Sequence, residues 1–291
     1  QCEFLDPTLL GFTSYYSFRA RYAVMRPITR DGFRQQMIPY GYQNLSELWE
    51  KIKPFSYRKI KENCLDLPPK VYMKRMLQMS TEQMEVYNQL RKYARAVIMD
   101  KEISYTNKLT EILRLHQVTS GFYKTDDGQI KSLKNPKITE LCNIIDETDG
   151  KIIIWANYLH NIHDILETLK KKFPEDRAVS IYGAVSVPDR DKAVVDFQTD
   201  KYTRFMVGNP ATGGLGLNLT AATTVIYFSN SYDLTLREQS EDRAHRKGQT
   251  KSVTYIDLIM QGTIDEFIIR ALNKKKSMSA QVLGEEVLKF L

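Results

Sequence analysis

The stretch Lys151-Ile152-Ile153-Ile154-Trp155 begins the part of the sequence whose pattern decides the fold. A short apolar run of this kind is typical of a strand that is buried on both faces. Comparable runs follow at 179–182, 204–207, 224–228 and 253–259, and helical patterns or turns separate them. This alternation predicts an α/β domain with a mostly parallel sheet that is flanked by helices.

Ligands of such parallel sheets bind at the carboxyl ends of the strands. We therefore expect function in the loops that follow the predicted strands. These loops are residues 156–158, 183–186, 208–216 and 229–234. The third loop contains Gly213, Gly214 and Gly216, whose backbone N–H groups can approach a phosphate or a nucleic-acid backbone. A tight turn from strand to helix needs the same glycines, so both interpretations stay open.

The stretch 239–249, with the sequence QSEDRAHRKGQ, carries a polar stripe where a core-facing helix would carry Leu, Ile or Val. If the stretch is a helix, Gln239, Arg243 and Arg246 fall at positions i, i+4 and i+7 of one face. Two guanidiniums one turn apart suit a phosphate chain, because each presents a planar fork of donors that stays charged. A solvated charged helix has the same pattern, so the surrounding sequence has to decide.

Composition sets limits on the class of protein. The chain has 291 residues and 42% apolar content, enough for one large domain or two ordinary ones. No run approaches 18 apolar residues, which predicts neither a membrane span nor a membrane partner. Cys2, Cys64 and Cys142 are too few and too widely spaced for a disulfide framework or a zinc site, which indicates a reducing compartment. Because translation begins with Met, we expect a chain that starts at Gln1 to be a piece of a longer one.

The N-terminal part is predicted to be mainly helical. Residues 1–66 are broken by prolines and glycines and show no convincing strand alternation, and apolar spacing indicates a helix at 44–53. Residues 1–80 hold 13 Lys and Arg against 7 Asp and Glu, whereas residues 81–291 hold 29 against 28. The basic, tyrosine-rich N-terminal part is compatible with binding to a nucleic-acid backbone, although a solvated basic surface has the same composition.

The middle of the chain is predicted to contain a strand, three helices and a linker. In order, these are a strand at 71–79, helices at 81–98 and 107–119, a linker at 124–135 and a helix at 138–145. Ser80 and Gln83 have the spacing of a capping box at the start of the first helix. The acidic run 146–149 looks like the end of a magnesium-binding strand, but the helical spacing before it and Gly150 after it favour a helix end.

The sequence lacks the parts that hold Mg²⁺ and the β- and γ-phosphates in a nucleoside triphosphatase. It contains no Gly-Lys-Ser/Thr phosphate loop. His160, His163 and Asp164 have no further ligand at zinc spacing, so no metal site is predicted. Arg243 and Arg246 are then best explained as half of a phosphoryl-transfer site that is completed elsewhere.

Two motifs identify a resemblance. The pattern Gln239-x-x-Asp242-Arg243-x-His245-Arg246-x-Gly248-Gln249 resembles the last helicase motif of the Swi/Snf-type ATPases in helicase superfamily two. Residues 213–222 are similar to the motif before it. The resemblance extends over nearly the whole chain, through Glu47-Leu48-Trp49, Leu67-Pro68-Pro69-Lys70 and Gly262-Thr263-Ile264-Asp265-Glu266. Ser231-Tyr232, where many eukaryotic relatives have Trp-Asn-Pro, is similar to bacterial and phage forms.

The resemblance implies a RecA-like parallel sheet flanked by helices and preceded by a mainly helical segment. It implies that residues 1–80 are a helical segment and the last strand of a first motor lobe. Residues 81–135 would be a helical region and linker, and residues 136–291 would be the second RecA-like lobe. The Walker lysine and the acidic box would then lie upstream of Gln1 in the parent protein.

The resemblance also implies roles for site residues. Arg243 and Arg246 would act as arginine fingers on ATP and Mg²⁺ held mainly by the first lobe, while Gln239 and Asp242 orient them and couple to DNA. The residues that would couple nucleotide state to the DNA backbone are Gly214, Gly216 and Asn218. The residues that would face the tracked strand are Asn157, Gly183 and Ser186.

The implied protein is an ATP-driven translocase or helicase that is inactive as this chain alone. Its partners would be double-stranded DNA and the first lobe of the same parent. It would work in the cytoplasm of a bacterial or phage-infected cell, or in the nucleus of a eukaryote. Two alternatives are a catalytically silent nucleic-acid-binding module and a sugar-nucleotide enzyme, which would need an acidic sugar-binding residue that we cannot locate. The sequence does not separate strand unwinding from translocation.

Overall fold

The computed structural model of the chain describes residues 8–30, 34–56, 66–99, 105–125, 127–212 and 216–282. It divides into two compact units. Unit 1 comprises Gln1–Cys64, Arg95–Leu109 and Asn273–Leu291, and unit 2 comprises Leu65–Ala94 and Thr110–Leu272. The expected boundaries after residues 80 and 135 both fall inside unit 2. All of the predicted strands lie in this unit, so unit 2 positions the candidate site.

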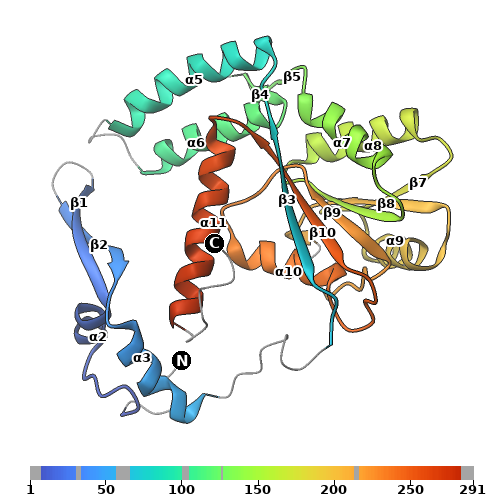
Figure 1. Cartoon of the computed structure of the whole chain (residues 1–291). Helices are drawn as coiled ribbons and strands as arrows, with labels where there is room; N and C mark the ends of the chain where they lie inside the picture. Colours follow the sequence, from blue (N-terminus) through green and yellow to red (C-terminus); the bar gives the residue numbers. More distant parts are fainter. Residues whose placement is uncertain are drawn as a thin grey trace. The chain divides into compact units, whose positions relative to one another are not determined.

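Unit 2 is built on a six-stranded sheet with the order β3-β10-β9-β6-β8-β7 (Figure 1). All neighbouring strands in it are parallel. The strands are β3 (Lys70–Leu77), β6 (Lys151–Trp155), β7 (Arg177–Ile181), β8 (Thr203–Gly208), β9 (Ala222–Tyr227) and β10 (Val253–Met260). The predicted parallel sheet is therefore confirmed, and its central strands are the apolar runs seen in the sequence.

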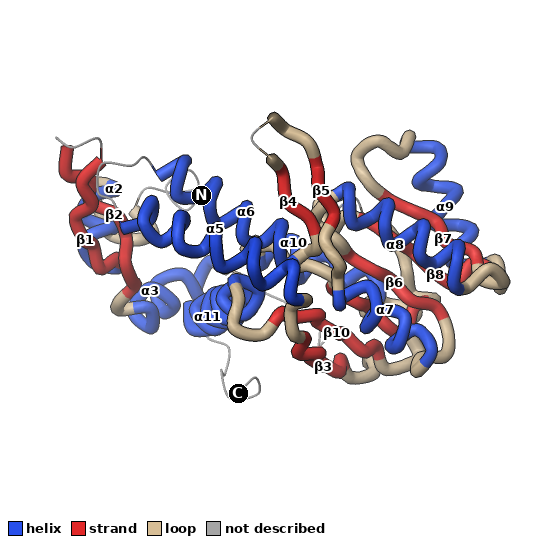
Figure 2. Tube along the Cα trace, turned by 90° about the horizontal axis from the view of Figure 1, so that it is seen from above, coloured by secondary structure: helices blue, strands red, loops and turns tan. Residues whose placement is uncertain are grey.

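Helices cover both faces of the sheet (Figure 1 and Figure 2). They are α7 (Pro136–Asp146), α8 (Leu159–Lys172), α9 (Val187–Thr199) and α10 (Leu234–Ala244). Side chains of α7 and α8 pack with Ile152 and Ile154 on one face. Side chains of α9 and α10 pack with Ile153 and Trp155 on the other. Successive strand residues thus enter different cores, which is why the run in β6 is continuously apolar.

The strand β3 was expected to complete a first motor lobe, and this expectation is wrong. Its eight residues pair with β10 from Lys70 opposite Val253 to Leu77 opposite Met260. The backbone N–H of Gln261 extends the pairing with a 2.8 Å bond to the carbonyl oxygen of Leu77. The hydrogen-bonding groups of this strand are satisfied by the sheet of unit 2, so β3 is an edge strand of that sheet.

The region that precedes α7 is also folded. It contains α5 (Thr81–Met99), α6 (Tyr105–Thr119) and a hairpin of β4 (Phe122–Lys124) and β5 (Ile130–Ser132). The capping box is confirmed, because Gln83 N donates to Ser80 Oγ and Ser80 N donates to Gln83 Oε1, both at 3.2 Å. The expectation of a linker at 124–135 is therefore wrong, since the β4–β5 hairpin extends into it as far as Ser132.

Unit 1 contains strands that the sequence pattern did not predict. Its described elements are α2 (Tyr15–Tyr22), β1 (Ala23–Arg30), β2 (Arg34–Tyr42), α3 (Leu45–Ile52) and η1 (Lys53–Phe55). The strands β1 and β2 form an antiparallel hairpin with a register shift between Val24 and Met25. Pro27 and Pro39 lie inside this hairpin, and a proline within a run weakens its strand signal. The expected helix at 44–53 is confirmed as α3.

Candidate functional site

The two motif segments predicted to cooperate are in contact. We call residues 209–221 the glycine loop and residues 239–249 the arginine segment. Arg246 Nη1 donates to the carbonyl oxygens of Gly216 and Leu217, at 3.2 and 3.0 Å. The backbone N–H of Leu219 donates to the carbonyl oxygen of Arg243 at 3.0 Å. The end of the glycine loop therefore sits directly on the residues predicted to act as arginine fingers.

Gln249 locks the same junction, and sequence reasoning gave it no role of its own. Its Nε2 donates to the carbonyl oxygens of Thr220 and Ala222 at 3.0 Å and of Ala244 at 3.1 Å. Its Oε1 accepts from the backbone N–H groups of the two residues that follow, at 3.0 Å. The sequence offered only one signal for this role, an amide at the end of a polar motif. The structure adds that the amide is buried, and buried amides are hydrogen-bonded.

The helical interpretation of the whole arginine segment is wrong. The helix α10 ends at Ala244, and its last bond joins His245 N to the carbonyl oxygen of Glu241. The chain then turns, with Gly248 at a φ of +99° that favours glycine. Arg246 therefore lies beyond the helix and cannot share one helical face with Gln239 and Arg243. The turn directs it to the glycine loop instead.

The arginines and their predicted helpers are partly accessible. Arg243 and Arg246 are half-buried, and burial together with the nearby charge of Arg246 lowers the pKa of the Arg243 guanidinium, opposed by Asp242. Two like charges held close together favour an anion between or beside them. Asp242 lies 3.3 Å from Lys70 Nζ, and Gln239 is exposed on α10.

The glycine-loop residues predicted to couple nucleotide and DNA are placed only in part. Gly216 has a φ of +68°, and Asn218 is exposed. Gly214 lies outside the described residues. The described parts of the loop, residues 209–212 and 216–221, lie at the carboxyl end of β8 and at the amino end of β9 respectively.

The residues predicted to face DNA lie at the carboxyl ends of strands. Asn157 follows β6, where its N–H donates to Ser229 Oγ and its carbonyl oxygen accepts from Asn209 Nδ2, both at 2.9 Å. Gly183 follows β7, and its carbonyl oxygen accepts from Arg190 Nη2 at 2.9 Å. Ser186 caps α9 through a 3.3 Å bond from Asp189 N.

The arginine segment lies at the opposite, amino ends of the strands. Its partners include Lys70, the first residue of β3, and Ala222, the first residue of β9. A six-residue strand spans about 20 Å, so the two groups of predicted residues are separated by the thickness of the sheet. The glycine loop joins the two ends, since its described residues follow β8 and precede β9.

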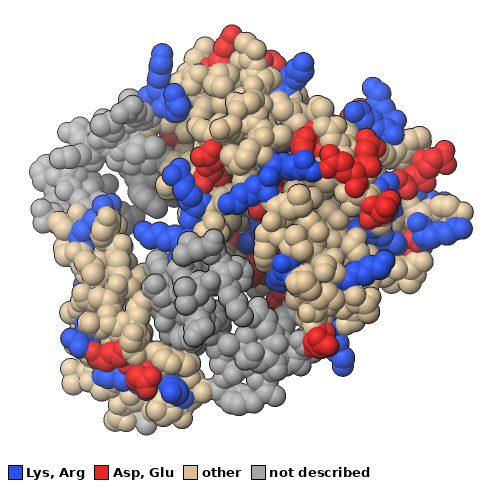
Figure 3. Space-filling view, in the orientation of Figure 1, with Lys and Arg blue, Asp and Glu red and all other residues tan. Residues whose placement is uncertain are grey.

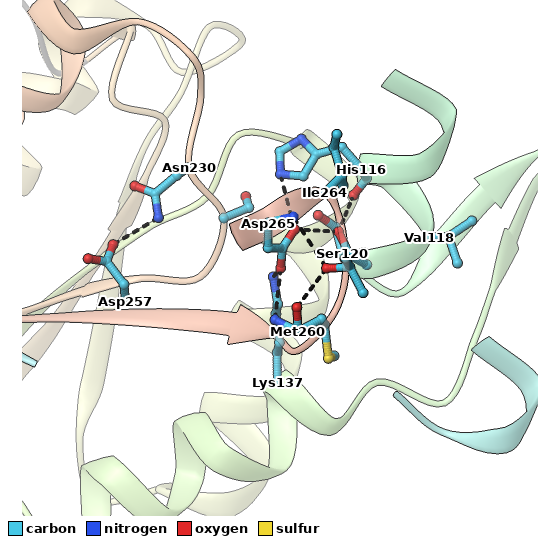
Figure 4. A network of polar contacts seen from close by, with 12 residues as sticks. His116, Val118, Ser120, Lys137, Asn230, Asp257, Met260, Ile264 and Asp265 are labelled. Carbon is cyan, nitrogen blue, oxygen red and sulfur yellow. Dashed lines mark hydrogen bonds and ion pairs between the residues drawn. The ribbon is translucent and has the colours of Figure 1, made fainter. Parts of the chain in front are cut away.

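A further polar network closes the carboxyl end of β10 (Figure 4). The buried Asp265, at the start of α11 (Ile264–Val282), accepts from Lys137 Nζ and Thr119 Oγ1 at 2.6 Å and from Met260 N at 3.1 Å. His116 lies 3.9 Å from the Asp265 carboxylate, and burial lowers the pKa of this histidine to about 4. These groups are enclosed by protein, so the network holds α6, α7 and α11 together.

Among the described residues, no group of three or more His, Cys, Asp or Glu side chains is arranged to hold a metal ion. Within the same part of the chain, no helix has the length and apolar character needed to cross a membrane.

Two family descriptions match this fold and these motifs. Residues 3–124 match the SNF2-related domain, and residues 136–248 match the helicase conserved C-terminal domain. Fold and motifs together define a RecA-like domain of a helicase and ATPase class. The chain is homologous to the SWI2/SNF2 ATPases, as the resemblance implied.

Curated relatives share this similarity over nearly the whole chain. A Bacillus subtilis protein with the provisional name ATP-dependent helicase/translocase YwqA is 29% identical over 299 residues, which cover 98% of this chain and 30% of that protein. The DNA repair and recombination protein RDH54 of Saccharomyces cerevisiae is 25% identical, covering 99% of this chain and 33% of its own length. The chain thus spans about a third of these relatives.

Solved structures of the family share the fold. The SWI2/SNF2 ATPase core domain of Sulfolobus solfataricus is 26% identical with a TM-score of 0.61, covering 98% of this chain and 57% of that one. The same core in complex with double-stranded DNA is 26% identical with a TM-score of 0.60, covering 97% and 59%. The C-terminal part of the Fun30 ATPase domain is 20% identical with a TM-score of 0.60, covering 71% and 89%, and it supports the fold alone.

Proposed function

We propose that this chain is the C-terminal motor region of an ATP-driven DNA translocase or helicase. It supplies Arg243 and Arg246 as arginine fingers to ATP that is bound on a first RecA-like lobe of the parent protein. At the other end of its sheet it contacts the DNA backbone through the loops that carry Asn157, Gly183 and Ser186. By itself, the chain hydrolyses ATP negligibly.

The glycine loop carries this proposal. At its start, Asn209 bonds to the carbonyl oxygen of Asn157, beside the residues assigned to DNA. At its end, Gly216 and Leu217 accept hydrogen bonds from Arg246. One loop would therefore link the end of the sheet that we assign to DNA with the end that we assign to ATP, and this link supports DNA-stimulated hydrolysis. Gly214, Gly216 and Asn218 belong to this loop as the coupling residues.

The chemistry of the arginine segment fits the phosphate side of an ATP site. Developing charge on a transferring phosphoryl group is stabilised by preorganised cations, and an arginine finger is worth 10³–10⁵ in kcat. Both arginines are tied to the glycine loop, Arg243 through its backbone carbonyl oxygen and Arg246 through its guanidinium. Gln239 and Asp242 precede Arg243 on α10, and we assign to them the orientation of the two arginines.

The remaining parts of the ATP site are assigned to the first lobe. The sequence contains no Gly-Lys-Ser/Thr loop to cradle the phosphates and to provide the hydroxyl that holds Mg²⁺. A relative whose provisional name is ATP-dependent helicase/translocase is about three times as long as this chain, because the match covers 30% of it. This extra length is the place we propose for the phosphate loop and the Mg²⁺ ligands.

The proposal of DNA as the partner rests on the solved core of a relative that is in complex with double-stranded DNA. On the face drawn in Figure 3, Lys and Arg side chains lie among Asp and Glu side chains, so this face of the described chain presents no single basic surface. We therefore assign the DNA contact to the carboxyl-end loops, where backbone N–H groups and small polar side chains can meet phosphates.

The test is the substitution Arg246→Ala in the full-length parent. We expect DNA-stimulated hydrolysis to fall by about 10³-fold or more, since the transition-state charge loses a finger. DNA affinity should stay unchanged, because the arginine lies at the opposite end of the sheet. Lys247→Ala is the matched control, since Lys247 is the next residue and is exposed.

Wild-type turnover by the Arg246→Ala parent would overturn the assignment of the finger. A parent protein that binds DNA in a salt-dependent way but shows no effect of ATP would instead favour the catalytically silent nucleic-acid-binding module.

A further inference from the structure

A buried carboxylate lies two residues before Arg243. Glu241, on the last turn of α10, is 4% exposed. Its Oε2 accepts from Lys70 Nζ at 3.1 Å and from Tyr72 Oη at 2.7 Å. Its Oε1 accepts from Arg237 Nε at 2.9 Å. Three donors from two different elements thus meet at one side chain.

The carboxylate is ionised in spite of its burial. Burial alone opposes the charge, but the positive charges of Arg237 and Lys70 and the hydrogen bond from Tyr72 outweigh it, so the pKa of Glu241 lies below its ordinary value. A buried charge is tolerated only when it is paired and hydrogen-bonded. The geometry of this part of α10 therefore depends on where its two cations are.

One of these cations, Arg237 of α10, is held by residues of β9 and β10 and of the loop between β9 and α10. Arg237 Nη1 bonds to Asn230 Oδ1 at 2.6 Å and to Asp257 Oδ1 at 2.5 Å. Its guanidinium carbon lies 3.5 Å from the centre of the Tyr227 ring. Arg237 is thus anchored by Tyr227, Asn230 and Asp257 in addition to its bond to Glu241.

The other cation comes from the start of β3 and touches the arginine segment twice. Lys70 Nζ reaches Asp242 Oδ1 at 3.3 Å as well as Glu241. Two residues before it, the carbonyl oxygen of Pro68 is 2.7 Å from His245 Nε2. These contacts fall on both sides of Arg243 along the chain. The segment Pro68–Tyr72 therefore contacts the last turn of α10, which carries Arg243, and the residue that precedes Arg246.

We propose that Lys70 is a positioning residue for the phosphoryl-transfer reaction: through Glu241 and Asp242 it sets the placement of Arg243 and Arg246. This inference rests on the proposed function. Lys70 also begins β3 immediately after Leu67-Pro68-Pro69, so it ties the arginine segment to the chain that enters the sheet.

The size of the effect follows from how catalysis depends on geometry. A misplacement of about 1 Å at a positioned group can cost 10²-fold in rate. Lys70 does not touch the phosphates, and Arg237 still neutralises part of the Glu241 charge when Lys70 is changed. We therefore expect the loss of Lys70 to lower the rate by about 10- to 100-fold, which is less than the loss of a finger.

The experiment compares Lys70→Met and Lys70→Arg in the full-length parent, with duplex DNA present. For Lys70→Met we expect kcat to fall by about 10- to 100-fold with little change in the KM for ATP, because the interaction acts on the transition state. Lys70→Arg keeps a cation at the site and should restore most of the rate. If Lys70 had only a structural role, Lys70→Met would lower the amount of folded protein. The folded fraction would then keep the wild-type kcat as well as the wild-type KM for ATP.

Lys74→Met is the matched control. Lys74 lies on the same strand, is exposed and forms no salt bridge among the described residues. If Lys70→Met does not fold, Tyr72→Phe decides the question, because it removes the 2.7 Å bond to Glu241 and keeps the ring that stacks on Tyr255. We expect a loss in kcat of a few-fold from that variant.

Wild-type kcat in Lys70→Met, an equal loss in Lys70→Arg, or wild-type kcat in Tyr72→Phe where Lys70→Met is unfolded would each overturn the inference. Arg246→Ala is measured alongside. If that variant keeps wild-type kcat, the proposed function fails, whereas a normal Lys70→Met beside an inactive Arg246→Ala contradicts only the role of Lys70.

Discussion

Two charge clusters lie at the two ends of β10 and differ in how they meet solvent. The carboxyl-end cluster consists of His116, Lys137 and Asp265, and the side chains of Lys137 and Asp265 are 0% and 6% exposed. The amino-end cluster consists of Lys70, Arg237, Glu241 and Asp242, and its outer members Lys70 and Asp242 are 23% and 48% exposed. One cluster is enclosed, and the other opens towards the arginines.

The difference separates stability from function. Removing one partner of an enclosed ion pair lowers the free energy of unfolding strongly, because the other partner is left as an uncompensated buried charge. A cluster that opens to solvent loses less when one cation is removed, because water and the remaining cation compensate. The partly exposed charges of the amino-end cluster lie beside Arg243. The enclosed pair of Lys137 and Asp265 instead holds α6, α7 and α11 together.

The largest effect on stability is expected from Lys137→Met. The substitution leaves the Asp265 carboxylate buried without its 2.6 Å partner, and breaking such a pair costs about 3–5 kcal/mol. The measurement is urea unfolding in a Trp49→Phe background, so that fluorescence reports the buried Trp155. Lys134→Met is the control, since Lys134 is exposed three residues earlier. A loss below about 1 kcal/mol would show that the cluster is not enclosed as described.

The next effect is a dependence on pH at the same cluster. Burial lowers the pKa of His116 from 6.5 to about 4, so the folded protein resists the proton that the unfolded chain accepts below pH 6.5. Stability should therefore fall as the pH drops from 6.5 towards 4, by on the order of 3 kcal/mol. The Asp265 carboxylate, whose pKa is lowered because Lys137 and His116 outweigh burial, adds its own loss as the pH falls through and below the range in which free aspartates titrate.

Unfolding free energies measured at several pH values check this dependence, and the variant His116→Gln serves as the comparison. The variant should have a flatter profile between pH 6.5 and 4. Parallel profiles for the two proteins would mean that the pKa of His116 is the same in the folded and unfolded states.

The smallest effect on stability is expected from Lys70→Met, the same substitution at the open cluster. Glu241 keeps its bonds to Arg237 and Tyr72, so we expect a loss of about 1–2 kcal/mol under the same urea conditions. Lys137→Met and Lys70→Met make the same chemical change in the two clusters, so the difference between their losses in unfolding free energy compares the clusters directly. A loss at Lys70 as large as that at Lys137 would remove the distinction between an open and an enclosed cluster.

Local patterns in the sequence were sufficient for some features. The apolar run in β6 predicted a buried parallel strand, and the spacing of Ser80 and Gln83 predicted a helix start, because both depend on neighbouring residues. The arginine segment and the glycine loop were found by motif, and their contact is confirmed by the bonds from Arg246.

Other features depend on partners that are remote in sequence. Lys70 and Glu241 are 171 positions apart, so no local pattern could show that Lys70 holds the arginine segment. The same reason explains why β3 was assigned to another lobe, since its pairing partner β10 lies far along the chain. The end of α10 at Ala244 was missed because the polar motif continues with helical spacing after the helix stops.

The central claim is that Arg246 stabilises the transition state of ATP bound on another lobe. The most direct measurement compares the affinities of wild-type and Arg246→Ala parent proteins for ADP-aluminium fluoride, which mimics the transferring phosphoryl group, and for a non-hydrolysable ATP analogue. We predict that the substitution weakens the transition-state mimic by about 10²-fold or more and changes the affinity for the ATP analogue much less. Equal weakening of both ligands, or of neither, would contradict the claim.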